Sequence, residues 1–125
     1  NPQGLVPQAD FARLASFGKA LKKIFSKPLG ETKGIGKEIT LNLRRPSYVN
    51  QVVLMEEISQ GERVRQYKLE GFAPQKGWIL ITEGTCIGHK RIIKFEKLFL
   101  SKLKVTVSKA TAIPIFRSFK TYSIA

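Results

Sequence analysis

Residues 52–71, VVLMEEISQGERVRQYKLEG, hold the pattern that decides the fold: an apolar run, an acidic pair, a glycine-centred connection and a second extended run. The apolar run, residues 52–55, is too short for a helix and suits a strand that is buried on both faces. Glu56 and Glu57 end this run, and Gly61 can adopt the positive φ that a tight connection requires. The stretch therefore predicts two strands of one sheet.

The second run, residues 63–70, alternates in the way that places successive side chains on opposite faces of a strand. One face is predicted to carry Arg65, Tyr67 and Leu69, and the other Val64, Gln66, Lys68 and Glu70. Similar short runs, separated by turn residues, recur about every ten residues along the chain. The predicted strands are residues 38–43, 48–55, 63–70, 78–83, 89–95, 102–107 and 115–124.

A series of short strands without intervening helices is typical of an antiparallel sandwich or barrel. Before the strands, apolar and aromatic residues recur at helical spacing and predict a helix over residues 8–25, with Pro7 at its first position and Pro28 as its stop. Residues 26–37 are rich in glycine and predict a connector. The predicted fold class is mostly β, an antiparallel β-sandwich with one N-terminal α-helix.

The composition indicates a folded and strongly basic chain. Its 125 residues fit one domain or one domain with an extra element, and 42% of them are hydrophobic. The net charge of +13 favours phosphates, sulfated glycans or anionic surfaces as partners. The 22 Lys and Arg are spread along the chain, however, which favours a solvated basic surface over a dedicated polyanion site. No stretch has the length of a transmembrane span or the layout of a signal peptide, so a soluble body is expected.

The single Cys86 and single His89 limit the chemistry that the chain can perform. They cannot form an internal disulfide or the clustered ligand set that zinc requires, and no cofactor is expected. Their close spacing also lacks the signature of a cysteine hydrolase. A buried or half-buried cysteine is the more common arrangement.

Glu56, Glu57 and Glu62 are the candidates for a pair of catalytic carboxylates, as in glycosidases. Adjacent residues of a strand point to opposite faces, so Glu56 and Glu57 cannot both face one site unless a bulge intervenes. In a chain of net charge +13 we expect these acids to pair with Arg or Lys.

Four residues are candidates for ligand binding, because their types stack on sugar rings or donate hydrogen bonds to hydroxyl and carboxylate groups. They are Trp78, His89, Lys90 and Arg91. A lone tryptophan in a β-sandwich is nevertheless more often a core residue than a binding platform.

Three segments carry a resemblance to a known family: residues 4–7 before a helix ending in KKIF at 22–25, GERVRQY at 61–67, and EGTCIGHKRI at 83–92. Together they resemble the C-terminal end of the α-L-fucosidases of glycoside hydrolase family 29, over essentially the entire chain. In that family a (β/α)₈-like catalytic barrel precedes a jelly-roll β-sandwich of the galactose-binding, discoidin type.

The resemblance implies that residues 1–27 are the last helix of such a barrel with the start of a linker, and that residues 28–125 are the sandwich. The family's catalytic acids lie in the barrel, so no residue here inherits a catalytic role and the chain alone is expected to be inactive. Its implied function is that of an accessory domain that packs on the barrel of a retaining enzyme cleaving terminal α-L-fucose. The implied location is secreted or periplasmic.

One departure from the family concerns calcium and sugar binding. Many relatives carry a polar stretch with aspartate-glycine and threonine-x-tryptophan patterns before the strand that matches residues 38–43, and this chain has only a short glycine-rich segment there. In discoidin-type domains such a loop often helps to hold a structural calcium and lines the sugar-facing rim. Two alternatives stay open: an independent module for fucosylated or galactosylated glycans, and a basic module for anionic glycan or, less expected, nucleic acid.

Overall fold

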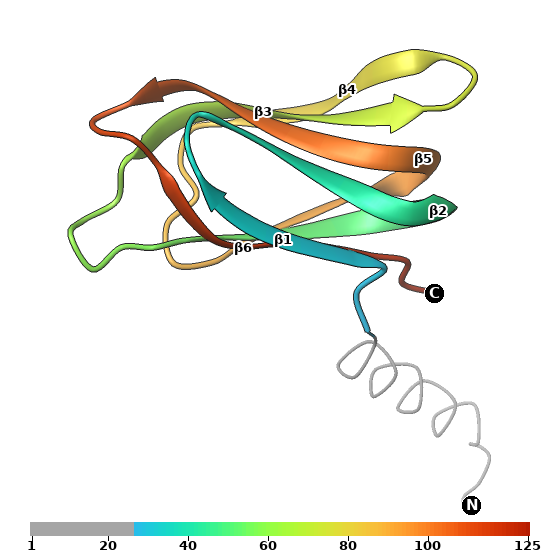
Figure 1. Ribbon diagram of the computed structural model, residues 1–125, viewed down its shortest axis with the longest axis horizontal. Coiled ribbons are helices and arrows are strands. Elements are labelled where there is room, and N and C mark those ends of the chain that lie inside the picture. Colours follow the sequence, from blue (N-terminus) through green and yellow to red (C-terminus); the bar gives the residue numbers. More distant parts are fainter. Residues whose placement is uncertain (1–26) are drawn as a thin grey trace, which may run out of the picture.

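The computed structural model describes residues 27–125, which form six antiparallel strands (Figure 1). The strands are β1 (Gly30–Ile35), β2 (Glu38–Glu56), β3 (Val64–Ala73), β4 (Gly77–Gly84), β5 (Arg91–Ala110) and β6 (Ile115–Tyr122). They are hydrogen-bonded in the order β1-β6-β2-β5-β3-β4. The predicted antiparallel β fold is confirmed, and the helix predicted for residues 8–25 lies outside the described residues.

A single sheet makes both layers of the sandwich because β2 and β5 are long and bent. The first half of β2 pairs with the second half of β5, from Glu38 opposite Thr106 to Asn42 opposite Lys102. The register then shifts around the Arg44-Arg45-Pro46 segment, and the second half of β2 pairs with the start of β5. Register shifts bend a strand, and here they fold the sheet over itself.

Each half of the two long strands has its own outer neighbour. The second half of β2 pairs with β6, which pairs with β1, and together with the start of β5 these strands form what we call layer I. The second half of β5 pairs with β3, which pairs with β4, and together with the first half of β2 they form layer II. The strands predicted separately at 38–43 and 48–55 are therefore two halves of β2, and those at 89–95 and 102–107 are parts of β5.

Strand β1 lies in the segment that the sequence predicted to be a connector. Its residues GETKGI include two glycines, which weaken strand propensity, so no local pattern marks it. Pairing with β6 holds it instead, from Gly30 opposite Thr121 to Ile35 opposite Ile115. The connector prediction is wrong for residues 30–35, because this strand depends on a partner distant in sequence.

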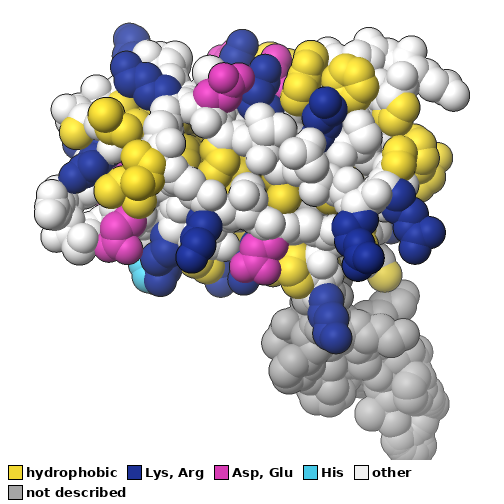
Figure 2. All heavy atoms as spheres, viewed as in Figure 1, with side chains coloured by type: hydrophobic (Ala, Val, Ile, Leu, Met, Phe, Trp, Pro, Cys, Tyr) yellow, Lys and Arg dark blue, Asp and Glu magenta, His cyan; other side chains and the backbone are white. Residues whose placement is uncertain are grey.

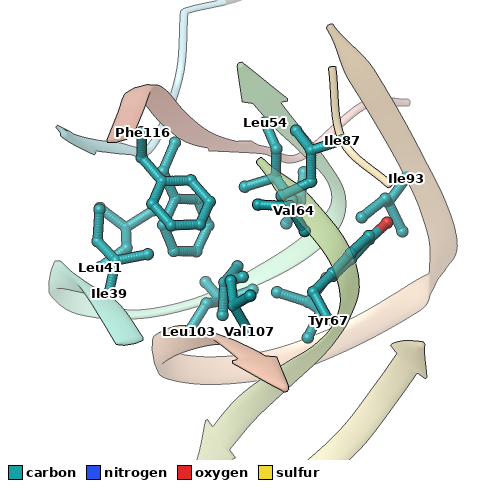
Figure 3. Close-up of a cluster of buried hydrophobic side chains, with 14 of the residues drawn as sticks. Ile39, Leu41, Leu54, Val64, Tyr67, Ile87, Ile93, Leu103, Val107 and Phe116 are labelled. Carbon is teal, nitrogen blue, oxygen red and sulfur yellow. The ribbon is translucent and has the colours of Figure 1, made fainter. Parts of the chain in front are cut away.

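The core lies between the two layers and is built from inward-facing side chains (Figure 3). The predicted inward face of residues 102–107 is confirmed, since Leu103, Val105 and Val107 are buried. The apolar run at 52–55 is also buried, except for the partly exposed Met55. In β3, register shifts after Val64 and Gln66 break the alternation, so Val64 is buried with Tyr67 and Leu69 rather than on the opposite face. The predicted face was therefore wrong for Val64, and also for Arg65, which is exposed.

Candidate functional site

The acidic pair is the first candidate site, and the structure separates its members. Glu56 is fully buried, whereas Glu57 is partly exposed beyond the end of β2. The Glu56 carboxylate accepts hydrogen bonds from the backbone N–H groups of Arg63 and Val64 through Oε2 and from that of Gly88 through Oε1. Its own N–H donates to the Gly88 carbonyl.

These contacts make Glu56 a structural crosslink. It joins the end of β2 to the connection before β3 and to the loop between β4 and β5. Within residues 27–125 the acids that form ion pairs are Glu31, Glu38 and Glu70. The prediction that Glu56 pairs with an Arg or Lys is therefore wrong. Backbone amides satisfy its charge instead.

Glu57 is held by a different contact. Its Oε2 accepts a hydrogen bond from the backbone N–H of Ser59 at 3.1 Å. The hydrogen bonds of Ser59, from its side chain and then its backbone, lower the pKa of the Glu57 carboxyl, with a smaller contribution from the charge of Arg117. Because one acid is buried against amides and the other caps a turn, the pair does not form a two-carboxylate hydrolytic site.

The segment His89-Lys90-Arg91 follows directly from the crosslinked loop. Gly88 has a φ of +70°, a conformation that favours glycine, and the three residues after it are exposed. Arg91 lies close enough to the hydroxyl of Tyr67 to lower the pKa of that phenol, whereas burial of the ring raises it more strongly. Cys86 is also exposed in this loop, so the expectation of a buried or half-buried thiol is wrong.

Trp78 lies at the opposite end of β4 from this segment. It is six residues from Gly84 along the strand, about 20 Å at strand spacing. Trp78 is 41% exposed, so it does not occupy the core position that is usual for a lone tryptophan. Its partners are Phe72, in an edge-on contact at 5.3 Å, and Lys104, whose Nζ lies 4.3 Å from the ring centroid.

The four predicted ligand-binding residues therefore do not form one site. The chain's own Lys104 makes a cation–π contact with the Trp78 ring. Lys104 is held there in turn by ion pairs with Glu38 at 3.3 Å and Glu70 at 4.0 Å. Of the four residues, Lys90 alone lines a surface groove.

That groove lies on the outer face of layer I and has a volume of about 630 Å³. Its walls come from β2, β5 and β6, the segment preceding β5, and the C-terminal residues. Its aliphatic and cationic lining includes Val53, Met55, Lys90, Ile92, Lys94 and Lys120. Sequence reasoning named only Lys90, although the alternation of Lys90, Ile92 and Lys94 on one strand face could have indicated its strand neighbours.

The part of the chain that the structure describes offers no cluster of acidic side chains for a structural calcium. Calcium takes several oxygen ligands, usually including carboxylates. Within residues 27–125 no three side chains from His, Cys, Asp and Glu gather at one place. A search of the same part of the chain finds no helix with the length and apolar character to cross a membrane.

The buried phenol predicts a specific loss of stability at high pH. Because the folded-state pKa of Tyr67 is raised above 10.0, its contribution is fully present below pH 10 and is lost as pH rises through the folded value. We expect the free energy of unfolding, measured by urea denaturation at pH 8, 10 and 11, to fall more steeply for the parent chain than for Tyr67→Phe. Parallel curves for the two proteins would contradict this assignment, because the titration of lysines is common to both.

Comparisons with known proteins show that the chain is similar to parts of larger proteins. No family model matches it. It is 38% identical to a solved Bacteroides thetaiotaomicron protein named “putative alpha-L-fucosidase”, with a TM-score of 0.80, covering 100% of this chain and 29% of that one. A glycoside hydrolase 29 family member from an unknown rumen bacterium is 28% identical, with a TM-score of 0.72, over 87% of this chain and 22% of that one.

A rice (Oryza sativa subsp. japonica) protein named “Putative alpha-L-fucosidase 1” is 30% identical over 86 residues. These residues are 69% of this chain and 16% of the rice protein. The chain thus spans less than a third of the length of each of these relatives, and it is similar to a domain-sized part of each.

Proposed function

We propose that this chain, which matches the C-terminal region of the family 29 α-L-fucosidases, serves as their non-catalytic accessory domain and packs on a catalytic domain that precedes it. The observation that carries the proposal is the similarity to the solved Bacteroides thetaiotaomicron protein. The two are 38% identical over the whole of this chain, which covers 29% of that protein. In the proposal, the catalytic domain hydrolyses terminal α-L-fucosides, and the protein acts outside the cytoplasm.

The surroundings of the buried acid favour a non-catalytic role for the described residues. The buried acid, Glu56, has its carboxylate occupied by backbone amides, so it has no oxygen aimed at a substrate. Glycoside hydrolysis of the usual kind needs two carboxyl groups across the scissile bond. The acid and the nucleophile are therefore assigned to the rest of the larger protein.

The docking surface in this proposal is the edge formed by β1. The chain enters β1 at Leu29, whose N–H donates to the Thr121 carbonyl at 2.8 Å, so a preceding domain is tethered beside this strand. Three aliphatic residues near β1 are exposed: Leu29 is 41% exposed, Ile35 73% and Ile113 62%. Ile35 and Ile113 come from the same end of the β1–β6 pair, where the Gly36 N–H donates to the Pro114 carbonyl. Ile35 and Ile113 thus form an exposed apolar pair at one end of the edge, and this pair is the contact that the proposal assigns to the catalytic domain.

The proposal predicts opposite results for the chain alone and for the longer protein. We expect residues 1–125 to leave an aryl α-L-fucoside unhydrolysed, and the longer protein to hydrolyse it. Hydrolysis by the 125-residue chain above background would overturn the proposal, as would a longer protein without fucosidase activity.

The docking surface is tested by Ile35→Glu. We expect it to lower the Tm of the longer protein by several degrees while leaving that of the 125-residue chain within about 2 °C. The matched control is Leu80→Glu, at a side chain of similar kind that is 53% exposed on β4, the strand at the other edge of the sheet. Equal effects of the two substitutions in the longer protein would place the contact elsewhere.

A further inference from the structure

The groove on the outer face of layer I combines a positive rim with an apolar floor. Lys90, just before β5, and Lys94, within it, each lie two residues from Ile92, and all three side chains line the groove. At strand spacing each lysine is about 7 Å from Ile92 along the backbone, and the two lysines are about 13 Å apart. Lys120 is opposite Val53 in the β2–β6 pair, and Val53 is opposite Ile92 in the β2–β5 pair. The backbone of Lys120 therefore lies two strand spacings, about 10 Å, from that of Ile92. Three cations therefore surround the aliphatic side chains of the floor.

The charges of this groove are only partly compensated. Lys120 forms an ion pair with Glu31 at 3.8 Å. Within residues 27–125, Lys90 and Lys94 take part in no ion pair, and no acidic residue lines the groove. An anionic ligand would supply the missing countercharge.

The size and floor of the groove indicate which kind of anion it suits. Its volume, about 630 Å³, lies in the range of small-ligand sites. Met55 and Ile92, together with the buried Val53, form an apolar floor on which the C–H face of a sugar ring can pack. Lysines at the rim can donate to charged substituents. Bound nucleic acid would instead need a continuous basic track. Figure 2 shows Lys and Arg side chains scattered over the visible face, with acidic groups between them.

We propose that this groove binds a short acidic oligosaccharide, with Lys90, Lys94 and Lys120 contacting its carboxylate or sulfate groups. The inference stands on the geometry of this chain and does not require the accessory role to be correct. It adds a glycan-binding surface on the outside of layer I, distinct from the edge that β1 forms.

The experiment titrates the 125-residue chain in low salt with four probes. They are a sulfated heparin tetrasaccharide, a tetragalacturonate that carries carboxylates only, a neutral cellotetraose and an oligothymidylate. We expect at least one acidic sugar to bind saturably, as measured by changes in the NMR chemical shifts of Ile92 and Tyr122. We expect the neutral sugar not to bind. The two acidic sugars distinguish sulfate from carboxylate as the group that is recognised.

Charge-matched variants decide whether the groove is responsible. We expect Lys90→Gln combined with Lys94→Gln to weaken binding about tenfold. The control, Lys76→Gln combined with Lys109→Gln, removes the same charge from exposed positions that do not line the groove, and its affinity should change less than twofold.

Three results would overturn the inference. They are the absence of saturable binding by either acidic sugar, equal losses in the two variants, and oligothymidylate binding as tight as that of the acidic sugars. The first would leave the accessory role untouched, because fucosidase activity of the longer protein is measured separately.

Discussion

Replacing Glu56 by alanine is expected to lower the free energy of unfolding by about 3 kcal/mol. The carboxylate is fully buried and accepts hydrogen bonds from three backbone N–H groups, those of Arg63, Val64 and Gly88. Alanine leaves these donors without their acceptor, and an unsatisfied buried donor costs about 1–3 kcal/mol. Urea denaturation of the 125-residue chain measures the loss.

The neighbouring acid supplies the matched control. Glu57→Ala removes the same charge one residue later, where the carboxylate accepts a hydrogen bond from Ser59 beyond the end of the strand. We expect it to cost about 0.5 kcal/mol. Similar losses in the two variants would show that the crosslink by Glu56 does not stabilise the fold. Glu56→Gln should fall between them, since the amide keeps one acceptor oxygen but turns its NH₂ group toward a backbone donor.

Gly84→Ala is expected to destabilise the domain by about 2 kcal/mol. A Cβ at this position would lie 2.6 Å from ring atoms of Tyr67, which is opposite Gly84 in the β3–β4 pair. Tyr67 is buried among core side chains and cannot move aside freely (Figure 3). The extra methyl group therefore forces the ring or the strand to shift, and the loss is measured by urea denaturation.

Gly34→Ala is the control for the glycine itself. A Cβ at Gly34 would meet Ile39 at 3.5 Å, an ordinary contact, so we expect a change within about 0.5 kcal/mol. Tyr67→Leu in the Gly84→Ala background should cost less than the sum of the single changes, because it removes the ring that the methyl group strikes. Strict additivity of the two substitutions would contradict the steric explanation.

Alternation of side chains was sufficient to predict the class of fold and much of its core. It identified Leu103, Val105 and Val107 as inward-facing, because a strand with one buried face repeats every second residue. It could not show that residues 38–43 and 48–55 belong to one strand, since that continuity depends on pairing with β5 through a bend. Strand β1 was missed for a related reason: its glycines carry no pattern, and β6 alone holds it in the sheet.

The candidate site depended even more on contacts between distant residues. A sequence pattern does not distinguish a glutamate that pairs with arginine from one that accepts backbone amides, so the role of Glu56 emerged only from its three-dimensional surroundings. The groove brings Lys120 near Lys90 and Lys94 through the register of β2 with both β5 and β6. Trp78 was selected for its residue type, and the structure shows that Lys104 lies over its partly exposed ring.

The pairing of the first strand with the last has a consequence for how the chain is made. Ile35, which ends β1, is 80 residues ahead of its partner Ile115. At typical elongation rates of 5–20 residues per second, β1 leaves the ribosome roughly 4 to 16 seconds before β6 does. The local β3–β4 hairpin can form during that interval, but layer I cannot be completed before translation reaches β6. The sandwich therefore finishes folding only near the end of its own synthesis.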